Sequence, residues 1–394
     1  MQEPTRGISP AQRLTQPAFT AAEYERRRRA VRDRMEANGV ACLLVHSFPN
    51  ICYLTGFETI APHKYFALAL PLEATPVLIT QDFEAHNAAL GSCEMECAPY
   101  GLDEDYIVAT RDLIATRGWA QSPLGIDLSS PGLLPSDCTR LLESLPQAKW
   151  TDATGWVESV RIIKTAAELD YIRQAAGWSS LGMAAAIDAI REGGSDNNVA
   201  AAAYEAMINA GSEYMCYAPI VTTGKRSGIP HSTHRRVQLD RGDPVFIELG
   251  ACCHRYSAPL MRTACVGSAP DTVRRLADAA RNSVETLIEN IRPGAIAGDV
   301  ARKAASQLRG IPESVIWHGF YGYSVGIGFP PEWHDGPALI REGSEMLLRP
   351  GMVFHCSTSL REIGCYGATV SETVAVTSQG CEVLTSAVRE LQIR

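Results

Sequence analysis

Short apolar runs alternate with amphipathic stretches along the first part of the chain. Two stretches place apolar residues at helical spacing, which predicts helices at residues 22–38 and 135–144. Mostly apolar runs bounded by turn residues predict buried strands. These runs lie at residues 40–46, 65–72, 75–80 and 125–127. Alternation of strands and helices is typical of an α/β domain, which we expect over residues 19–160.

A different pattern begins near Arg161. Thr165 and Glu168 can form a capping box, which predicts the start of a long helix that ends near Arg191. Further helical patterns lie at residues 198–210, 271–291 and 297–308, and strand-like runs at residues 245–249, 255–260, 263–266, 352–356 and 370–376. Helix pairs separated by antiparallel-looking strands predict an α+β domain over residues 161–394. The polar residues 1–18 are expected to form a flexible arm.

Charge and composition exclude several kinds of partner. The 394 residues carry a formal net charge of -8, so no broad basic surface is expected for a nucleic acid or an anionic membrane. The basic run at residues 26–29 lies in a helical pattern and is interpreted as a solvated helix face. No apolar run is long enough to span a bilayer, and the polar N-terminus shows no secretory signal. We therefore expect a cytoplasmic protein.

The cysteines change this picture little. The twelve thiols are expected to be reduced in a cytoplasm. Their spacing, with adjacent Cys252 and Cys253, with Cys93 four residues before Cys97, and without a Cys-x-x-Cys pair, does not predict a zinc site. Most of them are interpreted as small core residues.

A series of short motifs occurs in one order along the chain. The motifs are NICYLTGF at residues 50–57, RIIKTAAEL at 161–169, GDPVFIE at 242–248, YSAPLMRT at 256–263, RPG at 292–294, GYSVG at 322–326, PGMVF at 350–354 and SETVAVT at 371–377. Each is weakly specific alone, but the ordered set resembles the creatinase, prolidase and aminopeptidase P family.

The resemblance spans about residues 19–377 and carries several implications. It implies the pita-bread fold for the C-terminal domain and a creatinase-like α/β fold for the N-terminal domain. It also implies a homodimer in which the partner's N-terminal domain lines the active site. Residues 50–57 are similar to a strand-to-loop motif of the N-terminal domain, and residues 322–326 to a Gly-His-x-x-Gly loop.

Metal-dependent members of this family hold two divalent ions with two aspartates, one histidine and two glutamates. The resemblance places these five positions at Glu248, Pro259, Tyr323, Ser357 and Glu372. Proline has no side-chain donor, and a neutral tyrosine is a poor ligand for a hard divalent ion. Two carboxylates are too few for a dinuclear centre, so we expect no metal and no other cofactor. A mononuclear site of Glu248, Glu372 and His355 is a weaker alternative.

Within the family, the chain resembles the ectoine hydrolases, which also lack the metal set. The similarity is carried by EL at residues 248–249, RYSAP at 255–259 and GYSVGIGFPPEW at 322–333. Residues 60–66 (IAPHKYF) depart from the tryptophan-containing stretch of that subgroup, and Met261 departs from creatinase, which has a glutamate there. The resemblance implies a metal-independent hydrolase that opens a C–N bond of a small cyclic amidine. Ectoine or a close relative would give an N-acetyl-diaminobutyrate-type product.

The chemistry of an amidinium assigns expected roles to the polar residues. Glu248 is the expected nucleophile or base, and Glu372 is expected to hold the amidine N–H and to protonate the leaving nitrogen. The resemblance makes His231 a proton-transferring histidine. Tyr323 is expected to donate a hydrogen bond to an oxyanion or to the substrate. Further substrate contacts are expected from Tyr256, Arg262, Glu332, Trp333 and His355, with a structural role as the alternative for Arg262 and His355.

Two other classes of function remain open. One is a different creatinase-like C–N hydrolase, or a lyase, that acts on a small zwitterion. The other is an Xaa-Pro peptidase-like protein that has become a binding module. Retention of His231, Glu248 and Glu372 together argues against the binding module, because a buried carboxylate without a role is costly.

Overall fold

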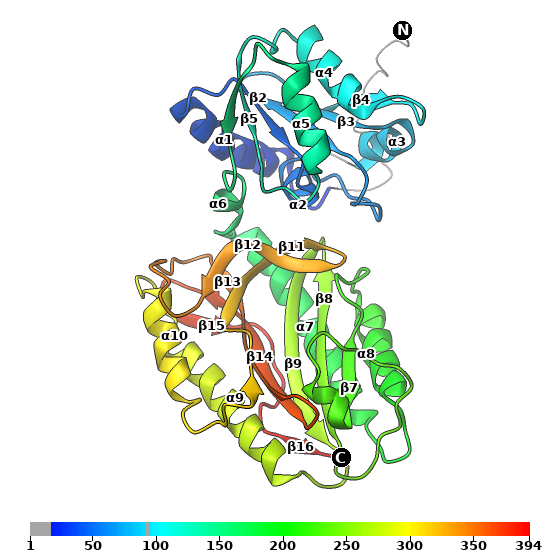
Figure 1. Cartoon of the computed structure of the whole chain (residues 1–394), viewed down its shortest axis with the longest axis vertical. Helices are drawn as coiled ribbons and strands as arrows, with labels where there is room; N and C mark the ends of the chain where they lie inside the picture. The colour runs from blue at the N-terminus through cyan, green and yellow to red at the C-terminus, as the bar shows by residue number, and fades with distance from the viewer. Residues whose placement is uncertain (1–16, 92–93) are drawn as a thin grey trace. The chain divides into compact units, whose positions relative to one another are not determined.

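The computed structural model describes residues 17–91 and 94–394, which divide into two compact units between Val160 and Arg161 (Figure 1). The predicted N-terminal arm, apart from residues 17 and 18, lies outside the described residues, as does Cys93. Within the described ranges, no helix combines the length and apolarity that crossing a bilayer demands.

The first unit is built on a six-stranded mixed sheet, in the order β4-β3-β2-β1-β5-β6. Its strands are β1 (Cys42–Val45), β2 (Ala67–Pro71), β3 (Val77–Gln81), β4 (Glu96–Tyr100), β5 (Pro123–Ile126) and β6 (Lys149–Asp152). Its helices are α1 (Ala21–Ala37), α2 (Phe48–Thr55), α3 (Asp82–Gly91), α4 (Tyr106–Thr116) and α5 (Pro135–Ser144), and α6 (Glu158–Arg161) crosses into the second unit. The α/β architecture predicted for this part of the chain is confirmed.

The strand-to-loop motif expected at residues 50–57 is wrong, because most of these residues form helix α2. The helix ends at Gly56, whose φ of 74° lies in the left-handed region. A β-carbon at this position would lie 2.6 Å from the hydroxyl oxygen of Tyr24. Glycine is therefore required here both for the backbone conformation and for the close approach of α1.

The interpretation of residues 26–29 as a solvated helix face is wrong for two of the four arginines. Arg27 and Arg28 are buried, and they donate hydrogen bonds to the carbonyls of Tyr53 and Leu54. These carbonyls lie in the last turn of α2, where a helix leaves its carbonyl groups without intrahelical partners. Arg27 and Arg28 thus connect α1 to the C-terminal end of α2.

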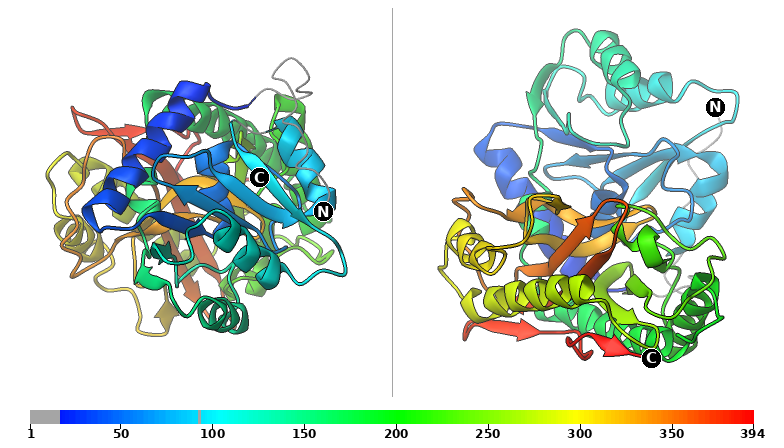
Figure 2. Two further views of the ribbon diagram at one scale, coloured as in Figure 1. Left: turned by 90° about the horizontal axis from the view of Figure 1, so that it is seen from above. Right: turned by 60° about the horizontal axis from the view of Figure 1, so that its bottom comes forward.

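The second unit carries a ten-stranded sheet flanked by helix pairs (Figures 1 and 2). Its main path runs β15-β14-β13-β11-β9-β8-β7, with β10 on β13, β12 on β11 and β16 on β9. The strands are β7 (Ile220–Thr223), β8 (Pro244–Cys253), β9 (Tyr256–Cys265), β10 (Val315–Ile316), β11 (Gly322–Phe329), β12 (Glu332–Ile340), β13 (Val353–Glu362), β14 (Gly367–Val376), β15 (Cys381–Val383) and β16 (Gln392–Ile393). The helices are α7 (Ala166–Asp188), α8 (Asp196–Ala210), α9 (Asp271–Asn290) and α10 (Ala297–Ser306).

Each helix pair covers its own part of this sheet. Helices α7 and α8 enclose one apolar core with β7, β8 and β9, and α9 and α10 enclose a second with β12, β13 and β14. The capping box predicted at Thr165 and Glu168 starts α7 and is confirmed. The pita-bread architecture expected for this part of the chain is confirmed as well.

Two local expectations in this unit are wrong. The strands predicted at residues 255–260 and 263–266 are one continuous strand, β9, antiparallel to β8. Residues 322–326, expected to form a loop, begin strand β11, which lies between β9 and β13. These differences matter for function, because β8, β9, β11 and β13 become neighbours in the middle of one sheet.

A buried ion cluster explains the motif at residues 161–169. The carboxylate of Asp335 pairs with Arg161 and Lys164, and all three side chains are almost fully buried. Burial acts to raise the pKa of Asp335, but the two adjacent cations hold that pKa below its ordinary value. A side chain at Gly326 would collide with this carboxylate. The cluster ties the start of the unit to β11 and β12, with one carboxylate shared between two cations.

Candidate active site

A cavity of about 130 Å³ lies against the central strands of the second unit. Glu248 (β8), Tyr323 (β11), Trp333 (β12) and His231 line it, so the structure brings these predicted site residues together. The other lining residues are Tyr217, Ile220, Pro230, Met261, His318, Phe320, His334, Ser357 and Arg361. The lining therefore combines one carboxylate and one guanidinium with several imidazole and aromatic rings.

Glu248 is the acidic group of this cavity. Within the described part of the chain, its carboxylate forms no recorded hydrogen bond or ion pair, although Glu248 is largely enclosed. Burial raises the pKa of Glu248 to about 7, and the charge of Arg361 opposes that rise. A carboxyl group with this pKa can accept a proton and release it near neutral pH, as a catalytic base requires.

Arg361 faces Glu248 in the cavity and was not predicted. Its guanidinium packs on the ring of Phe246, at 3.9 Å from the ring centroid. Burial lowers the pKa of Arg361 to about 10, against the attraction of Glu248, so the group stays charged at neutral pH. Strand alternation is a signal that could have found it, because Arg361 lies four residues after Ser357 on the same face of β13. No comparable sequence signal marks Tyr217 or His334.

A hydrogen-bonded chain leads from Tyr323 into the core. The tyrosine oxygen lies 2.8 Å from Nε1 of Trp333 and 2.7 Å from Nδ1 of His355. The other ring nitrogen of His355, Nε2, lies 2.6 Å from the hydroxyl oxygen of Ser371, which also accepts the backbone N–H of Met261. Burial lowers the pKa of His355 to about 3, so its ring is neutral.

The pattern of donors assigns the protons in this chain. Among the described residues, the only acceptor recorded for the Ser371 hydroxyl proton is Nε2 of His355. The remaining ring proton then lies on Nδ1 and is donated to Tyr323. Because the indole N–H of Trp333 is also donated to Tyr323, the tyrosine keeps its own proton for a group in the cavity. Burial and the charge of Glu248 hold the pKa of Tyr323 well above its ordinary value, so this hydroxyl remains a donor.

This places His355 inside the wall of the cavity. It is fully buried and is absent from the cavity lining, where a direct substrate contact was expected to lie. Its hydrogen bonds to the Tyr323 and Ser371 hydroxyls connect it to the cavity through Tyr323.

His231 lies at the exposed side of the cavity, in the loop after β7. Its φ of 51° is in the left-handed region, which is unusual for a residue other than glycine and marks strained backbone. Arg226 holds the following residues by donating to the hydroxyl of Ser232 and to the carbonyl of Thr233, at 2.7 and 2.6 Å. The hydrogen bonds of Arg226 thus hold the backbone directly after His231, the residue that the sequence analysis selected.

Trp333 covers Pro259, which stands at the position of the second metal-binding aspartate of metal-dependent family members. Pro259 pairs with Gly250 across β8 and β9. A β-carbon on Gly250 would lie 3.0 Å from the indole ring of Trp333 and 3.2 Å from the Cα of Pro259. The indole therefore occupies the space above this residue pair, and glycine at position 250 lets it approach.

Glu372 lies outside the cavity, contrary to the expectation that it faces the substrate beside Glu248. It is 1% exposed, and its Oε1 accepts hydrogen bonds from Nη2 of Arg262 at 2.6 Å and Nε of Arg389 at 2.8 Å. Its Oε2 accepts the hydroxyl of Thr385. Successive side chains of a strand point to opposite faces, and on β14 it is Ser371 that points toward His355.

The remaining expected contacts also lie elsewhere. Arg262 is buried, pairs with Glu372 and donates to backbone carbonyls, including those of Ser371 and Val388. The Tyr256 hydroxyl donates to Glu168 of the capping box. Glu332 is exposed and accepts the backbone N–H groups of Trp333 and His334. Arg262, Tyr256 and Glu332 do not line the cavity.

The five positions compared with metal ligands are only partly assembled. Glu248, Tyr323 and Ser357 line the cavity, whereas Pro259 and Glu372 do not. Within residues 17–91 and 94–394, no group of three or more histidine, cysteine or acidic side chains is arranged to hold a metal ion. The donor set at the cavity therefore does not fit the dinuclear metal centre of the metal-dependent relatives.

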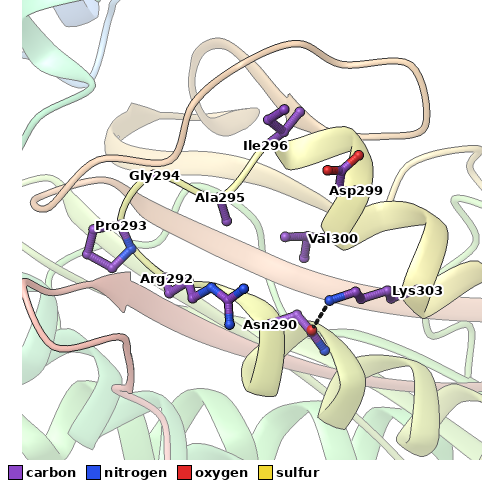
Figure 3. Close-up of a pocket in the computed structure, with 9 residues that line it drawn as sticks. All are labelled: Asn290, Arg292, Pro293, Gly294, Ala295, Ile296, Asp299, Val300 and Lys303. Atoms are coloured by element: carbon purple, nitrogen blue, oxygen red, sulfur yellow. Dashed lines mark hydrogen bonds between the residues drawn. The ribbon is translucent and has the colours of Figure 1, made fainter.

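A second, larger cavity of about 360 Å³ lies between the end of α9 and the start of α10 (Figure 3). In Figure 3, Lys303 donates to the side-chain oxygen of Asn290, at 2.6 Å. Arg292 and Asp299, which also line it, are exposed. Because exposed charges are well solvated, this cavity offers no unusual reactivity, and we assign the chemistry to the cavity at Glu248.

The fold and the site together define a pita-bread enzyme with a creatinase-like N-terminal domain. Residues 170–378 match metallopeptidase family M24, and residues 27–163 match the creatinase/prolidase N-terminal domain. The chain therefore belongs to metallopeptidase family M24, and the protein is a hydrolase.

Similar proteins cover nearly the whole chain. The ectoine hydrolase of Halomonas elongata is 28% identical over 95% of this chain and 98% of its own. An Xaa-Pro dipeptidase of Pyrococcus horikoshii is 25% identical over 91% of this chain and 96% of its own. Among solved structures, the prolidase of Thermococcus sibiricus has the same fold, with a TM-score of 0.83 and 23% identity, over 94% of this chain and 99% of that one.

Proposed function

We propose that the protein hydrolyses a C–N bond of a small cyclic amidine, ectoine or a close relative, without a metal ion. The observation that carries this proposal is Glu248, a carboxylate with a pKa of about 7 and no recorded partner among the described residues, in a small aromatic-lined cavity. The similarity to an ectoine hydrolase over 95% of the chain supports the same substrate class.

The size and lining of the cavity favour a small cation over a peptide. Its volume of about 130 Å³ is well below the roughly 300 Å³ at which drug-sized ligand pockets begin. Tyr217 and Trp333 lie edge to face, 4.6 Å between ring centroids, and Tyr323 completes the aromatic wall. Aromatic faces attract a delocalised cation, and the carboxylate of Glu248 would pair with its N–H groups.

The proposed reaction moves protons from water to a ring nitrogen through Glu248. The ionised carboxylate of Glu248 takes a proton from a water molecule. At the same time the water oxygen bonds to the amidinium carbon, and the C=N electron pair moves to nitrogen. Glu248 passes this proton to one ring nitrogen, and the C–N bond breaks as the second proton of the added oxygen returns to Glu248. That proton finally reaches the leaving amine. The products are an amide and an ammonium group, and Glu248 ends ionised.

Two further cavity residues support this sequence. The Tyr323 hydroxyl, with its proton directed into the cavity, would donate a hydrogen bond to the oxygen added at carbon. His231, at the exposed side, would exchange protons between the site and solvent. Glu372, the group first expected to protonate the leaving nitrogen, has no part in this scheme, because its oxygens are paired with Arg262, Arg389 and Thr385.

A proton NMR time course with ectoine in the presence of EDTA tests the proposal. We expect ring opening to an N-acetyl-diaminobutyrate at an unchanged rate after chelation, and less than one metal ion per chain by elemental analysis. Loss of turnover on chelation with recovery on metal addition would disprove metal independence. Binding of ectoine without turnover would favour a binding module, and cleavage of Xaa-Pro dipeptides would contradict the proposed substrate class.

A further inference from the structure

Arg361 has a donor edge that the protein leaves unused. Its Nη1 donates to the carbonyls of Ser227 and Ile229, at 2.7 and 3.2 Å. Within residues 17–91 and 94–394, no hydrogen bond is recorded for Nε, which is a buried atom, or for Nη2. The side chain is 7% exposed and lines the cavity. A buried charged donor without an acceptor is costly, which points to an acceptor that arrives with a ligand.

The unused edge has the shape that carboxylates prefer. Nε and Nη2 form one side of the planar guanidinium, so their two N–H groups are parallel and can bind both oxygens of a carboxylate. The ring of Phe246 supports the flat face of the group, 3.9 Å from its central carbon. Packing of the face and fixation of Nη1 hold the remaining edge in one orientation.

Glu248 does not use this edge either. Both groups line the same cavity and attract each other, but within the described residues no ion pair joins them. The cavity therefore holds an ionisable carboxyl group and a guanidinium that do not bind each other. Arg262, the arginine first expected to bind a substrate carboxylate, is committed to Glu372 and to backbone carbonyls.

We infer that Arg361 binds the carboxylate of the substrate, so that the ligand is a zwitterion held between Glu248 and Arg361. This inference rests on the proposed function for the cationic end of the ligand. It adds that the protein also binds the anionic end of the ligand, and it predicts that an amidine without a carboxylate is a poor substrate.

Arg361 also has a structural role that an experiment must separate from ligand binding. Its bonds to Ser227 and Ile229 hold the loop that carries His231. Arg226 holds the same loop through Ser232 and Thr233 and does not line the cavity. Arg226→Met, which also removes the ion pair with the buried Asp196, is therefore the control for the loss of an arginine that fastens this loop.

The first measurement compares kcat/KM for ectoine and for 2-methyl-1,4,5,6-tetrahydropyrimidine, the same ring without the carboxylate. We expect the natural protein to prefer ectoine by roughly 10- to 100-fold, the range of a charged hydrogen-bonded contact. Arg361→Met should lose this preference and process both compounds slowly, whereas Arg226→Met should keep it. Equal rates for the two compounds with the natural protein, or an unchanged preference in Arg361→Met, would overturn the inference.

The second measurement needs no turnover and so separates this inference from the proposed function. Benzoate has a six-membered ring and a carboxylate but no amidine, and its binding can be followed by ligand-observed NMR. We expect benzoate to bind the natural protein and Glu248→Gln, and to bind Arg361→Met at least tenfold more weakly. Melting curves of the variants confirm folding. Equal binding to Arg361→Met, or no binding to the natural protein, would refute a carboxylate site even if ectoine is hydrolysed.

Discussion

Two glutamates on one sheet show what distinguishes a reactive carboxylate from a structural one. Glu248 on β8 and Glu372 on β14 both lie in apolar strands of the second unit. Glu372 binds Arg262, Arg389 and Thr385, whereas Glu248 has no hydrogen bond or ion pair within the described residues and is attracted by the charge of Arg361. Burial alone does not explain the difference, because the unreactive Glu372 is more deeply buried than Glu248. Pairing separates them, because a paired charge stabilises the fold and an unpaired one is available to a ligand.

The largest expected effect is on catalysis at the unpaired glutamate. Glu248→Gln should lower kcat for ectoine by about 10²- to 10⁴-fold, because a general base is lost. Its melting temperature should not fall, since the carboxylate has no recorded partner in the described residues that the change would leave unsatisfied. Steady-state kinetics and calorimetry measure both. Glu332→Gln, at an exposed carboxylate outside the cavity, is the control. If Glu248→Gln had the same kcat as the natural protein, another group would be the base.

The second effect is on stability at the paired glutamate. Glu372→Gln should lower the free energy of unfolding by about 3–5 kcal/mol, because Arg262 would remain buried with its charge unpaired. Activity per folded molecule should be retained. Urea unfolding provides the measurement, and Glu382→Gln, which breaks the exposed pair with Arg173, should change stability by less than about 1 kcal/mol. Loss of activity without loss of stability would instead restore the proton-donor role first expected of Glu372.

A third, smaller effect is expected at Ser371, which precedes Glu372 on β14. Ser371→Ala should lower kcat roughly tenfold, because His355 would no longer be held as the tautomer that donates to Tyr323. If Ser371 acts through the tyrosine, the same change should have no further effect on kcat in a Tyr323→Phe background. Independent, additive losses in the double variant would show that Ser371 has only a packing role.

The last effect is a pH dependence of stability. The pKa of Glu248 is raised from 4.5 to about 7 in the folded protein, so the folded state binds more protons than the unfolded state between these values. This contribution to stability therefore falls as pH rises from about 4.5 to 7 and is constant at higher pH. The melting temperature of Glu248→Gln minus that of the natural protein should increase from pH 5 to pH 8. A difference independent of pH would show that the pKa is not raised.

The sequence predicted most of the fold because local patterns and framework motifs agreed with each other. Amphipathic spacing located α1 and α5, and the Thr165 capping box located the start of α7. Glu248 could be predicted because it follows an apolar run directly. Tyr323 and Trp333 could be predicted because each lies in a motif with family character, and His231 because the family resemblance places a histidine at its position.

Contacts between distant segments account for what the sequence could not predict. Whether Ser371 or Glu372 faces the cavity depends on strand register and on Arg262, 110 residues away. A shift of one residue exchanges the two faces of a strand, so motif alignment alone cannot decide between neighbours. Arg361 was missed for a related reason: its significance depends on Phe246 and on the loop at Ser227, which only the folded chain brings together.

The indole of Trp333, packed above Gly250 and Pro259, also limits how this enzyme can change by mutation. An aspartate introduced at position 259 would direct its carboxylate into space that the ring already fills. Replacement of that one residue therefore cannot rebuild a metal site. Room for a carboxylate there requires loss of the tryptophan, and with it the N–H that Tyr323 accepts. A change that opens this space for a metal ligand would therefore also disturb the two donors that direct the Tyr323 proton into the cavity.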